Sequence, residues 1–164
     1  MPVKPIPDGY HTVTPYLVVK GAAGLIDFMK KAFDAKEISR HAGPDGGIAH
    51  ADMLVGTSHV MIGEPMGSEW PAMPAAMYLY VPDVDATYKK AVAAGGVSTR
   101  PPTDEFYGDR SAGVKDAYGN AWWMATHKED VSEEEMQRRM KAMKPPPDAK
   151  AAAKTDAKPA AAKK

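Results

Sequence analysis

The sequence contains five histidines, the side chains whose charge changes near neutral pH and that often ligate metal ions. They are His11, His41, His50, His59 and His127. No two of them form an HxH or HxxxH pair, the spacings that bring two imidazoles to one ion from a single element. Surface or hydrogen-bonded histidines are therefore the favoured interpretation. The alternative is an unconventional metal site that gathers His11, His50, Glu64 and His127.

His50 has the best-defined setting of the five. The stretch from Ile48 to Met53 alternates along the chain, and in a strand this alternation puts His50 and Asp52 on the same face. If that face lines a cavity, His50 is a weak candidate for a catalytic acid or base near neutral pH. A structural role for His50 is equally compatible with the sequence.

Aromatic side chains recur on two predicted strands. Thr14, Tyr16 and Val18 share one face of the first, and Ala76, Tyr78 and Tyr80 share the matching face of the second. Together with Trp123 they predict an aromatic, weakly polar cavity suited to a planar or apolar ligand. The alternative is that these side chains simply fill the cavity as core.

Arg110 stands in the loop Gly108-Asp109-Arg110-Ser111. Its planar guanidinium can clamp a carboxylate or phosphate, or it can pair with Asp109 or Asp116 and hold the loop. The ligand-binding candidates are therefore Thr14, Tyr16, His50, Tyr78, Tyr80, Arg110 and Trp123.

Several function classes are excluded or disfavoured by composition. The 164 residues include no cysteine, which rules out disulfides and thiolate sites. No Gly-rich phosphate loop or nucleophile-elbow motif is present. The tail from Pro145 carries five lysines against two aspartates, so its charge is +3 and the body's is −3. An acidic body disfavours nucleic acid as a partner, and no leader or membrane-length apolar run is seen, which predicts a cytoplasmic protein without a membrane partner.

Two copies of one strand–helix–three-strand order organise the chain. The first copy has a strand in 11–19, an amphipathic helix over 22–35, a strand over 36–41 and a hairpin over 48–62. The second has a strand over 76–81, a helix over 83–94, a strand over 97–100, a loop over 101–106 and a hairpin over 113–126. Tyr16-Leu17-Val18-Val19 matches Tyr78-Leu79-Tyr80-Val81. This internal duplication predicts paired modules.

The domain boundaries follow from this order. We expect an extended lead-in at 1–10 and a domain at 11–140, with module one at 11–63, a linker at 64–75 and module two at 76–127. A capping box at Ser132 and Glu135 predicts a C-terminal helix over 131–143, and the Ala/Lys/Pro-rich composition predicts a disordered tail at 145–164. The fold class is α+β: paired βαβββ modules forming a curved mixed sheet around a concave cavity, with helices on the convex side.

These modules resemble a known family. The stretches PYLVV, IAHADMLVG, YLYVPDVDATYKKAVAAG and FYGDRSAGVKDAYGNAWWMATHKEDVSEEE are similar to the glyoxalase/bleomycin resistance/dioxygenase superfamily, the vicinal oxygen chelate fold, and within it to the PhnB-like branch. The similarity extends over roughly residues 11–139.

The resemblance implies where a metal site would lie. Metal-dependent members place one ligand on each of four strands, His on the first strand of a module and Glu on the last. Those positions hold Thr14, Ala76, Val60 or Met61, and Trp123, none of which suits a divalent ion. We therefore expect no metal and no other cofactor. Relatives commonly dimerise, which implies a homodimer with each cavity built from two chains.

The sequence thus predicts a metal-free protein that binds a small aromatic or hydrophobic molecule in its concave cavity. The alternative is a lyase, isomerase or dioxygenase-like enzyme of the same superfamily, with a non-standard metal or an acid–base site such as His50 with a tyrosine.

Overall fold

The computed structural model describes residues 3–143, and the predicted tail at 145–164 lies outside them. Residues up to Glu129 form one compact unit and residues from Asp130 belong to a second. In the second unit, helix α3 (Glu133–Ala142) begins at Ser132, whose hydroxyl accepts the backbone N–H of Glu135 at 3.3 Å. The predicted N-terminal cap of this helix is therefore confirmed. No helix in 3–143 is long and apolar enough to cross a membrane.

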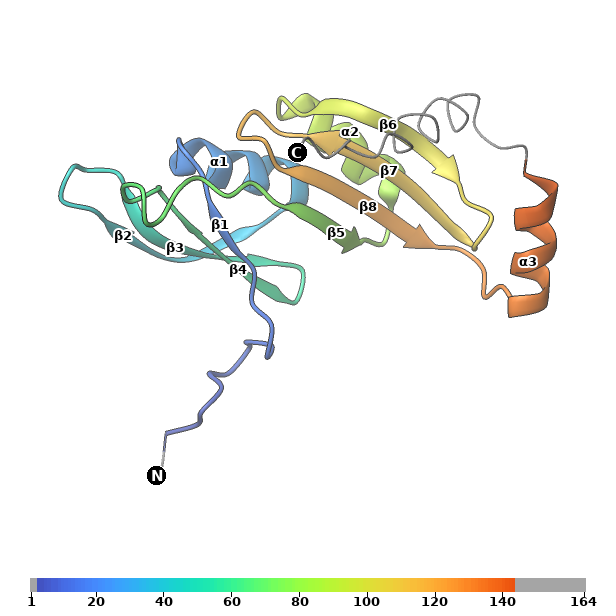
Figure 1. The fold of residues 1–164 in the computed structure, drawn as a ribbon, viewed down its shortest axis with the longest axis horizontal. Coiled ribbons are helices and arrows are strands. Elements are labelled where there is room, and N and C mark those ends of the chain that lie inside the picture. Colours follow the sequence, from blue (N-terminus) through green and yellow to red (C-terminus); the bar gives the residue numbers. More distant parts are fainter. Residues whose placement is uncertain (1–2, 144–164) are drawn as a thin grey trace, which may run out of the picture. The chain divides into compact units, whose positions relative to one another are not determined.

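The first unit contains two βαβββ modules (Figure 1). Module one comprises β1 (Tyr16–Val18), α1 (Ala22–Phe33), β2 (Lys36–Ala42), β3 (Ile48–Val55) and β4 (Ser58–Gly63). Module two comprises β5 (Ala76–Tyr80), α2 (Val84–Ala93), β6 (Val97–Asp104), β7 (Asp109–Lys115) and β8 (Ala121–His127). The predicted duplication and the α+β class are confirmed.

Each module builds its own four-stranded mixed sheet. The strand orders are β1-β4-β3-β2 and β5-β8-β7-β6, with β1 parallel to β4 and β5 parallel to β8. The expectation of one curved sheet is corrected here, because no strand of one module pairs with a strand of the other in the described chain. One reason is visible at β1, where the linker N–H of Met73 donates to the carbonyl of Val18 at 2.8 Å and occupies that strand's outer edge.

The registers of the two modules match. Tyr16 faces Met61 across β1 and β4, and Tyr78 faces Trp123 across β5 and β8. Cross-strand partners point to the same face of a sheet, so the repeat predicted from the sequence is reproduced residue by residue. The remaining doubt between Val60 and Met61 is settled in favour of Met61, since Val60 faces the core.

One hydrophobic core joins both modules. Helix α1 contributes its predicted apolar stripe, and α2 lies against α1. Phe33 of α1 packs on the indole of Trp122 of β8 with ring centres 4.8 Å apart. We call the opposite side of each sheet, turned away from α1 and α2, its open face. The residues buried from α1 are Ala22, Leu25, Ile26, Phe28, Met29, Ala32 and Phe33.

Three boundaries differ from the prediction by more than two residues. Strand β1 begins at Tyr16 because Pro15, which has no N–H to donate, marks the end of regular pairing. Strand β6 continues to Asp104, into the loop predicted at 101–106, since Pro101 and Pro102 are tolerated on an edge strand with an irregular register. Strand β7 begins at Asp109 rather than Gly113.

The β7–β8 turn is organised by Asp116. Its carboxylate accepts the backbone N–H groups of Tyr118 and Asn120 at 2.8 and 2.9 Å, the Asn120 amide at 2.8 Å and the Trp122 indole N–H at 2.8 Å. Gly119 adopts a left-handed backbone with φ 94°, which a residue without a β-carbon tolerates. Asn120 does not, and its side chain instead accepts the backbone N–H of Ala75 at 3.0 Å, tying the linker to the turn.

Candidate functional site

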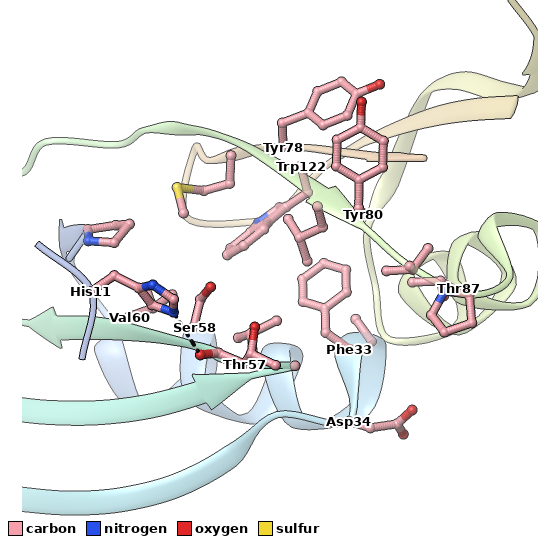
Figure 2. Close-up of a pocket in the computed structure, with 18 of the residues that line it drawn as sticks. His11, Phe33, Asp34, Thr57, Ser58, Val60, Tyr78, Tyr80, Thr87 and Trp122 are labelled. Carbon is pink, nitrogen blue, oxygen red and sulfur yellow. Dashed lines mark hydrogen bonds between the residues drawn. The ribbon is translucent and has the colours of Figure 1, made fainter. Parts of the chain in front are cut away.

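A cavity of about 590 Å³ lies where the two modules meet (Figure 2). One wall comes from β5 and the other from the end of α1 and the β3–β4 turn. Its size is typical of small-molecule sites. Most of its lining is apolar or aromatic: Val13, Pro15, Ala32, Phe33, Val55, Val60, Met77, Tyr78, Leu79, Tyr80, Val81, Pro82 and Trp122. The few polar groups include His11, Thr57, Ser58 and Thr87.

The base of this cavity is formed by Trp122 and Phe33. Trp122 is buried because β8 turns alternate side chains toward α1, and its indole N–H is satisfied by Asp116. Phe33 closes the last turn of α1, after which Asp34 ends the helix with φ 53°. The two rings are held from both modules at 46° to each other and close the cavity at its base.

Tyr78 and Tyr80 form the rim of the cavity on β5. Both are exposed, at 49% and 68%, and their rings lie 5.5 Å apart. Tyr80 donates to Asp109 at 3.0 Å, and this hydrogen bond raises the pKa of the phenol. Partial burial and a hydrogen bond with Tyr107 raise the pKa of Tyr78. Both phenols therefore stay neutral at physiological pH.

Asp109 carries a second partner on the open face of module two. Its other oxygen lies 2.8 Å from Nδ1 of His127, while its side chain is almost fully buried. A buried carboxylate thus orients both a phenol and an imidazole. His127, predicted as a surface or hydrogen-bonded histidine, is hydrogen-bonded.

Tyr16 and His50 come together on the open face of module one. The Tyr16 hydroxyl lies 3.3 Å from His50 Nδ1, and the indole of Trp70 from the linker meets the Tyr16 ring edge-on at 5.9 Å. Neither Tyr16 nor His50 lines the 590 Å³ cavity. The candidates from the sequence therefore fall into two groups, Tyr16 with His50 on module one and Tyr78 with Tyr80 and Trp123 on module two.

Asp52 lies on the same open face as His50, as the alternation predicts. Its carboxylate binds Tyr10 of the N-terminal lead-in rather than facing a ligand cavity. It is 1% exposed and accepts from the Tyr10 hydroxyl and from Nδ1 of His59, the latter at 2.8 Å. The ring of Tyr10 stacks on His59 at 4.0 Å. The hydrogen bond to Asp52 raises the pKa of Tyr10.

Arg110 is engaged by two carboxylates that the sequence prediction did not name. It makes a bidentate pair with Asp85 at 2.7 and 2.9 Å and contacts Asp104 at 3.1 Å. These contacts raise the pKa of Arg110 and lower that of Asp85. Arg110 borders a separate polar cavity of about 320 Å³ with Lys128, and there it holds β7 to the start of α2.

Thr14 and Trp123 complete the predicted set. Thr14 precedes β1 and donates to the carbonyl of His11 at 3.2 Å, outside the 590 Å³ cavity. Trp123 is half-buried on the open face of module two, and its neighbour Trp122 is the tryptophan that lines the cavity.

The four positions at which metal-dependent relatives hold their ion do not fit one here. The matching registers put Met61 and Trp123 at the equivalent places on β4 and β8, and Thr14 and Ala76 stand at the other two. Thioether, indole, hydroxyl and methyl groups do not form a binding set for a hard or borderline divalent cation. Within residues 3–143, no three His, Asp or Glu side chains cluster in a way that could hold a metal.

Sequence reasoning missed several residues at the cavity. Phe33 belonged to the apolar face of the predicted helix, Val60 was considered only as a metal-ligand position and Trp122 was not singled out, yet all three line the cavity. The available signal was the alternation in β8, which puts Trp122 and Trp123 on opposite faces. Alternation does not say which face meets the other module.

Comparison with known proteins identifies the family. Residues 10–124 match the model of the Glyoxalase/Bleomycin resistance protein/Dioxygenase superfamily. An uncharacterized protein of Mycobacterium bovis is 33% identical over 138 residues, covering 78% of this chain and 91% of that protein. An uncharacterized protein of Mycobacterium tuberculosis is also 33% identical, over 78% of this chain and 81% of its own length.

Solved structures share the fold. TioX from Micromonospora sp. ML1 superposes with a TM-score of 0.61 at 23% identity, over 71% of this chain and 98% of that one. A PhnB protein from Bacillus cereus superposes with a TM-score of 0.57 at 19% identity, over 71% of this chain and 99% of that one. A glyoxalase/bleomycin resistance protein/dioxygenase from Nocardioides superposes with a TM-score of 0.57 at 15% identity, over 75% of this chain and 87% of that one. The family model matches most of the chain, the solved structures share its fold, and the chain belongs to the glyoxalase/bleomycin resistance protein/dioxygenase superfamily.

Proposed function

We propose that this protein binds a small aromatic or hydrophobic molecule in the cavity between β5 and α1, without a metal ion at the superfamily's ligand positions. The observation that carries the proposal is the cavity itself. It has about 590 Å³ of space, an aromatic base at Phe33 and Trp122, and a rim of neutral tyrosines. Apolar walls with a few oriented polar groups favour a planar ligand that stacks, with its polar edge at the rim.

The donor chemistry of the rim narrows the ligand further. The Tyr80 hydroxyl donates its hydrogen to Asp109, so its oxygen is available to accept a hydrogen bond from a ligand. Among the described lining residues there is no lysine or arginine to pair with a carboxylate or phosphate. We therefore expect neutral aromatic molecules with a hydroxyl, amide or amine edge to be preferred over anionic ones.

The proposal includes a homodimer. Each sheet has an open face on which aromatic side chains are exposed, Tyr16 on module one and Tyr78 and Tyr80 on module two. Strand β5 is also an outer strand of its sheet, with the tyrosines beside its free edge. A second copy that covers these faces would remove aromatic surface from water and enclose the cavity mouth. Light scattering that gives a monomer mass would refute the dimer.

Ligand binding is tested by thermal shift with two matched variants. Val13 at the cavity mouth and Val97 on β6 are both exposed, at 81% and 69%, but only Val13 lines the cavity. A panel of aromatic metabolites and glycopeptide-type drugs is screened against untagged protein. Compounds that bind should raise the melting temperature of wild type and of Val97→Trp. The same compounds should raise the melting temperature of Val13→Trp much less, because its indole fills the cavity mouth. Equal shifts in all three proteins would place binding elsewhere, and a panel without any hit would count against the proposal.

Metal content is measured on the same untagged protein. Wild type that has been purified in metal-free buffer and treated with a chelator should still bind its ligand at full stoichiometry. Loss of ligand binding on chelation, restored by Zn, Ni, Fe or Mn, would overturn the metal-free part while leaving the cavity in place.

A second function is favoured by one contact, the pairing of His50 with Tyr16. An imidazole beside a phenol can take a proton from a carbon acid and return it to a neighbouring carbon, as in an isomerase. The test is deuterium exchange from solvent into a panel of small carbonyl compounds. Exchange should vanish in His50→Gln and persist in His41→Gln, and an absence of exchange in wild type would remove this candidate.

A further inference from the structure

His41 and His50 face each other across the antiparallel pair β2–β3 on the open face of module one. They are direct cross-strand partners, and their rings are nearly parallel, with centres 6.2 Å apart and planes 25° apart. His41 is exposed and His50 is half-buried. Direct partners of this kind have β-carbons about 4.5–5.5 Å apart, which lets two imidazoles approach one point.

The hydrogen bonding of His50 leaves one ring nitrogen for a ligand. Nδ1 lies 3.3 Å from the Tyr16 hydroxyl. When Nδ1 carries the proton and donates it to that oxygen, Nε2 keeps its lone pair and faces away from Tyr16. This is the arrangement by which an outer partner orients a metal-binding histidine. The imidazole of His41 makes no side-chain hydrogen bond within the described part of the chain, so we expect its ring to be able to rotate toward His50.

The spacing is close to what one ion needs. Two imidazoles bound tetrahedrally at about 2.0–2.1 Å have ring centres roughly 5 to 5.5 Å apart. The ring centres, 6.2 Å apart, would have to approach by about 1 Å, which we expect rotation about the side-chain bonds to provide.

From this geometry we propose that His41 and His50 bind one divalent transition-metal ion. Imidazole ligands suit Zn²⁺, Ni²⁺ and Cu²⁺, and with two protein ligands the remaining positions belong to water or to an incoming ligand. The site is independent of the aromatic cavity, because neither histidine lines it. Tyr16 is a positioning residue that acts through His50.

The test is isothermal titration of chelated, untagged protein with NiCl2, ZnCl2 or CuSO4. Wild type should bind one ion, and His41→Gln and His50→Gln should each weaken binding at least tenfold. His11→Gln is the matched control, an exposed histidine outside the pair, and should bind as wild type does. Tyr16→Phe should keep the stoichiometry and weaken affinity by a smaller factor.

Spectroscopy separates this site from adventitious binding. The Cu²⁺ complex of wild type should show two coupled nitrogens in its electron paramagnetic resonance spectrum, and each single variant one. Circular dichroism of the variants confirms that they fold. Wild-type affinity retained in both His41→Gln and His50→Gln, or no binding in wild type, would overturn the proposal. Because ligand binding in the cavity is measured by thermal shift in metal-free buffer, a failure here leaves the proposed aromatic site untouched.

Discussion

The indole N–H of Trp122 donates to Asp116 at 2.8 Å, and the same indole forms the base of the cavity. The turn before β8 therefore determines where the cavity's aromatic surface lies. Asp116 accepts three further N–H groups and is buried, so its carboxylate links the turn to the ring that a ligand would contact.

Replacing Asp116 should be costly. Asp116→Ala leaves buried donors without acceptors, which predicts a loss of at least about 2 kcal/mol in the free energy of unfolding. Asp116→Asn keeps one acceptor oxygen and should lose less. Urea unfolding followed by tryptophan fluorescence measures both. Equal stability of Asp116→Ala and wild type would show that water satisfies these donors.

Gly24 and Tyr118 provide a test of how the modules lock together. A β-carbon at Gly24 would lie 1.9 Å from the Tyr118 hydroxyl, so Gly24→Ala must displace the ring that packs on α1. We expect Gly24→Ala to destabilise the protein by roughly 1–3 kcal/mol. In a Tyr118→Ala background the same change should stabilise by about 0.5–1 kcal/mol, because alanine favours a helix interior over glycine. Additive effects in the double variant would contradict this contact.

Glu37 predicts an acid-sensitive contribution to stability. Arg40 and Lys30, at 2.7 Å each, lower the pKa of Glu37 to about 2 from an ordinary 4.5. A carboxyl with a lowered folded-state pKa stabilises the fold above its unfolded pKa and loses that contribution as pH falls toward the folded value. The stability difference between wild type and Glu37→Gln should therefore shrink between about pH 4.5 and 2. Glu69→Gln, for which no such ion pair is found among the described residues, serves as the control and should show no such trend.

The fold was predictable wherever one pattern decides the structure. The apolar stripe of α1 and the alternation of β3 and β8 specify both element and face, and Tyr16 and Tyr78 occupy equivalent registers as predicted. The second half of edge strand β6 was missed because Pro101 and Pro102 argue against a strand everywhere except at an edge. Which strand becomes an edge depends on tertiary pairing.

The site was predictable only in part, for a related reason. The aromatic rim at Tyr78 and Tyr80 follows from local alternation. The base at Phe33 and Trp122 depends on how α1 of one module meets β8 of the other, which involves residues 89 positions apart in sequence. The carboxylates that engage Arg110 likewise come from α2 and β6, so nearby Asp109 and Asp116 were the wrong partners. Local sequence does not encode such distant contacts.

The contact of Tyr10 with Asp52, between the N-terminal lead-in and module one, should contribute a stability that is lost at alkaline pH. The hydrogen bond to Asp52 raises the pKa of Tyr10, so the neutral phenol is favoured in the folded protein. That contribution is fully present below the unfolded pKa of about 10 and is lost as pH rises through the higher folded value. The stability difference between wild type and Tyr10→Phe, measured by urea unfolding, should therefore narrow above about pH 10.

Tyr10→Phe retains the stacking on His59 and should stay closer in stability to wild type than Tyr10→Ala at every pH. Tyr88→Phe, which removes a phenol bonded to Ser98 rather than to a carboxylate, is the matched control. A constant difference for Tyr10→Phe up to pH 11 would mean that the Asp52 contact does not form in solution, since ionised Tyr10 could not donate to it.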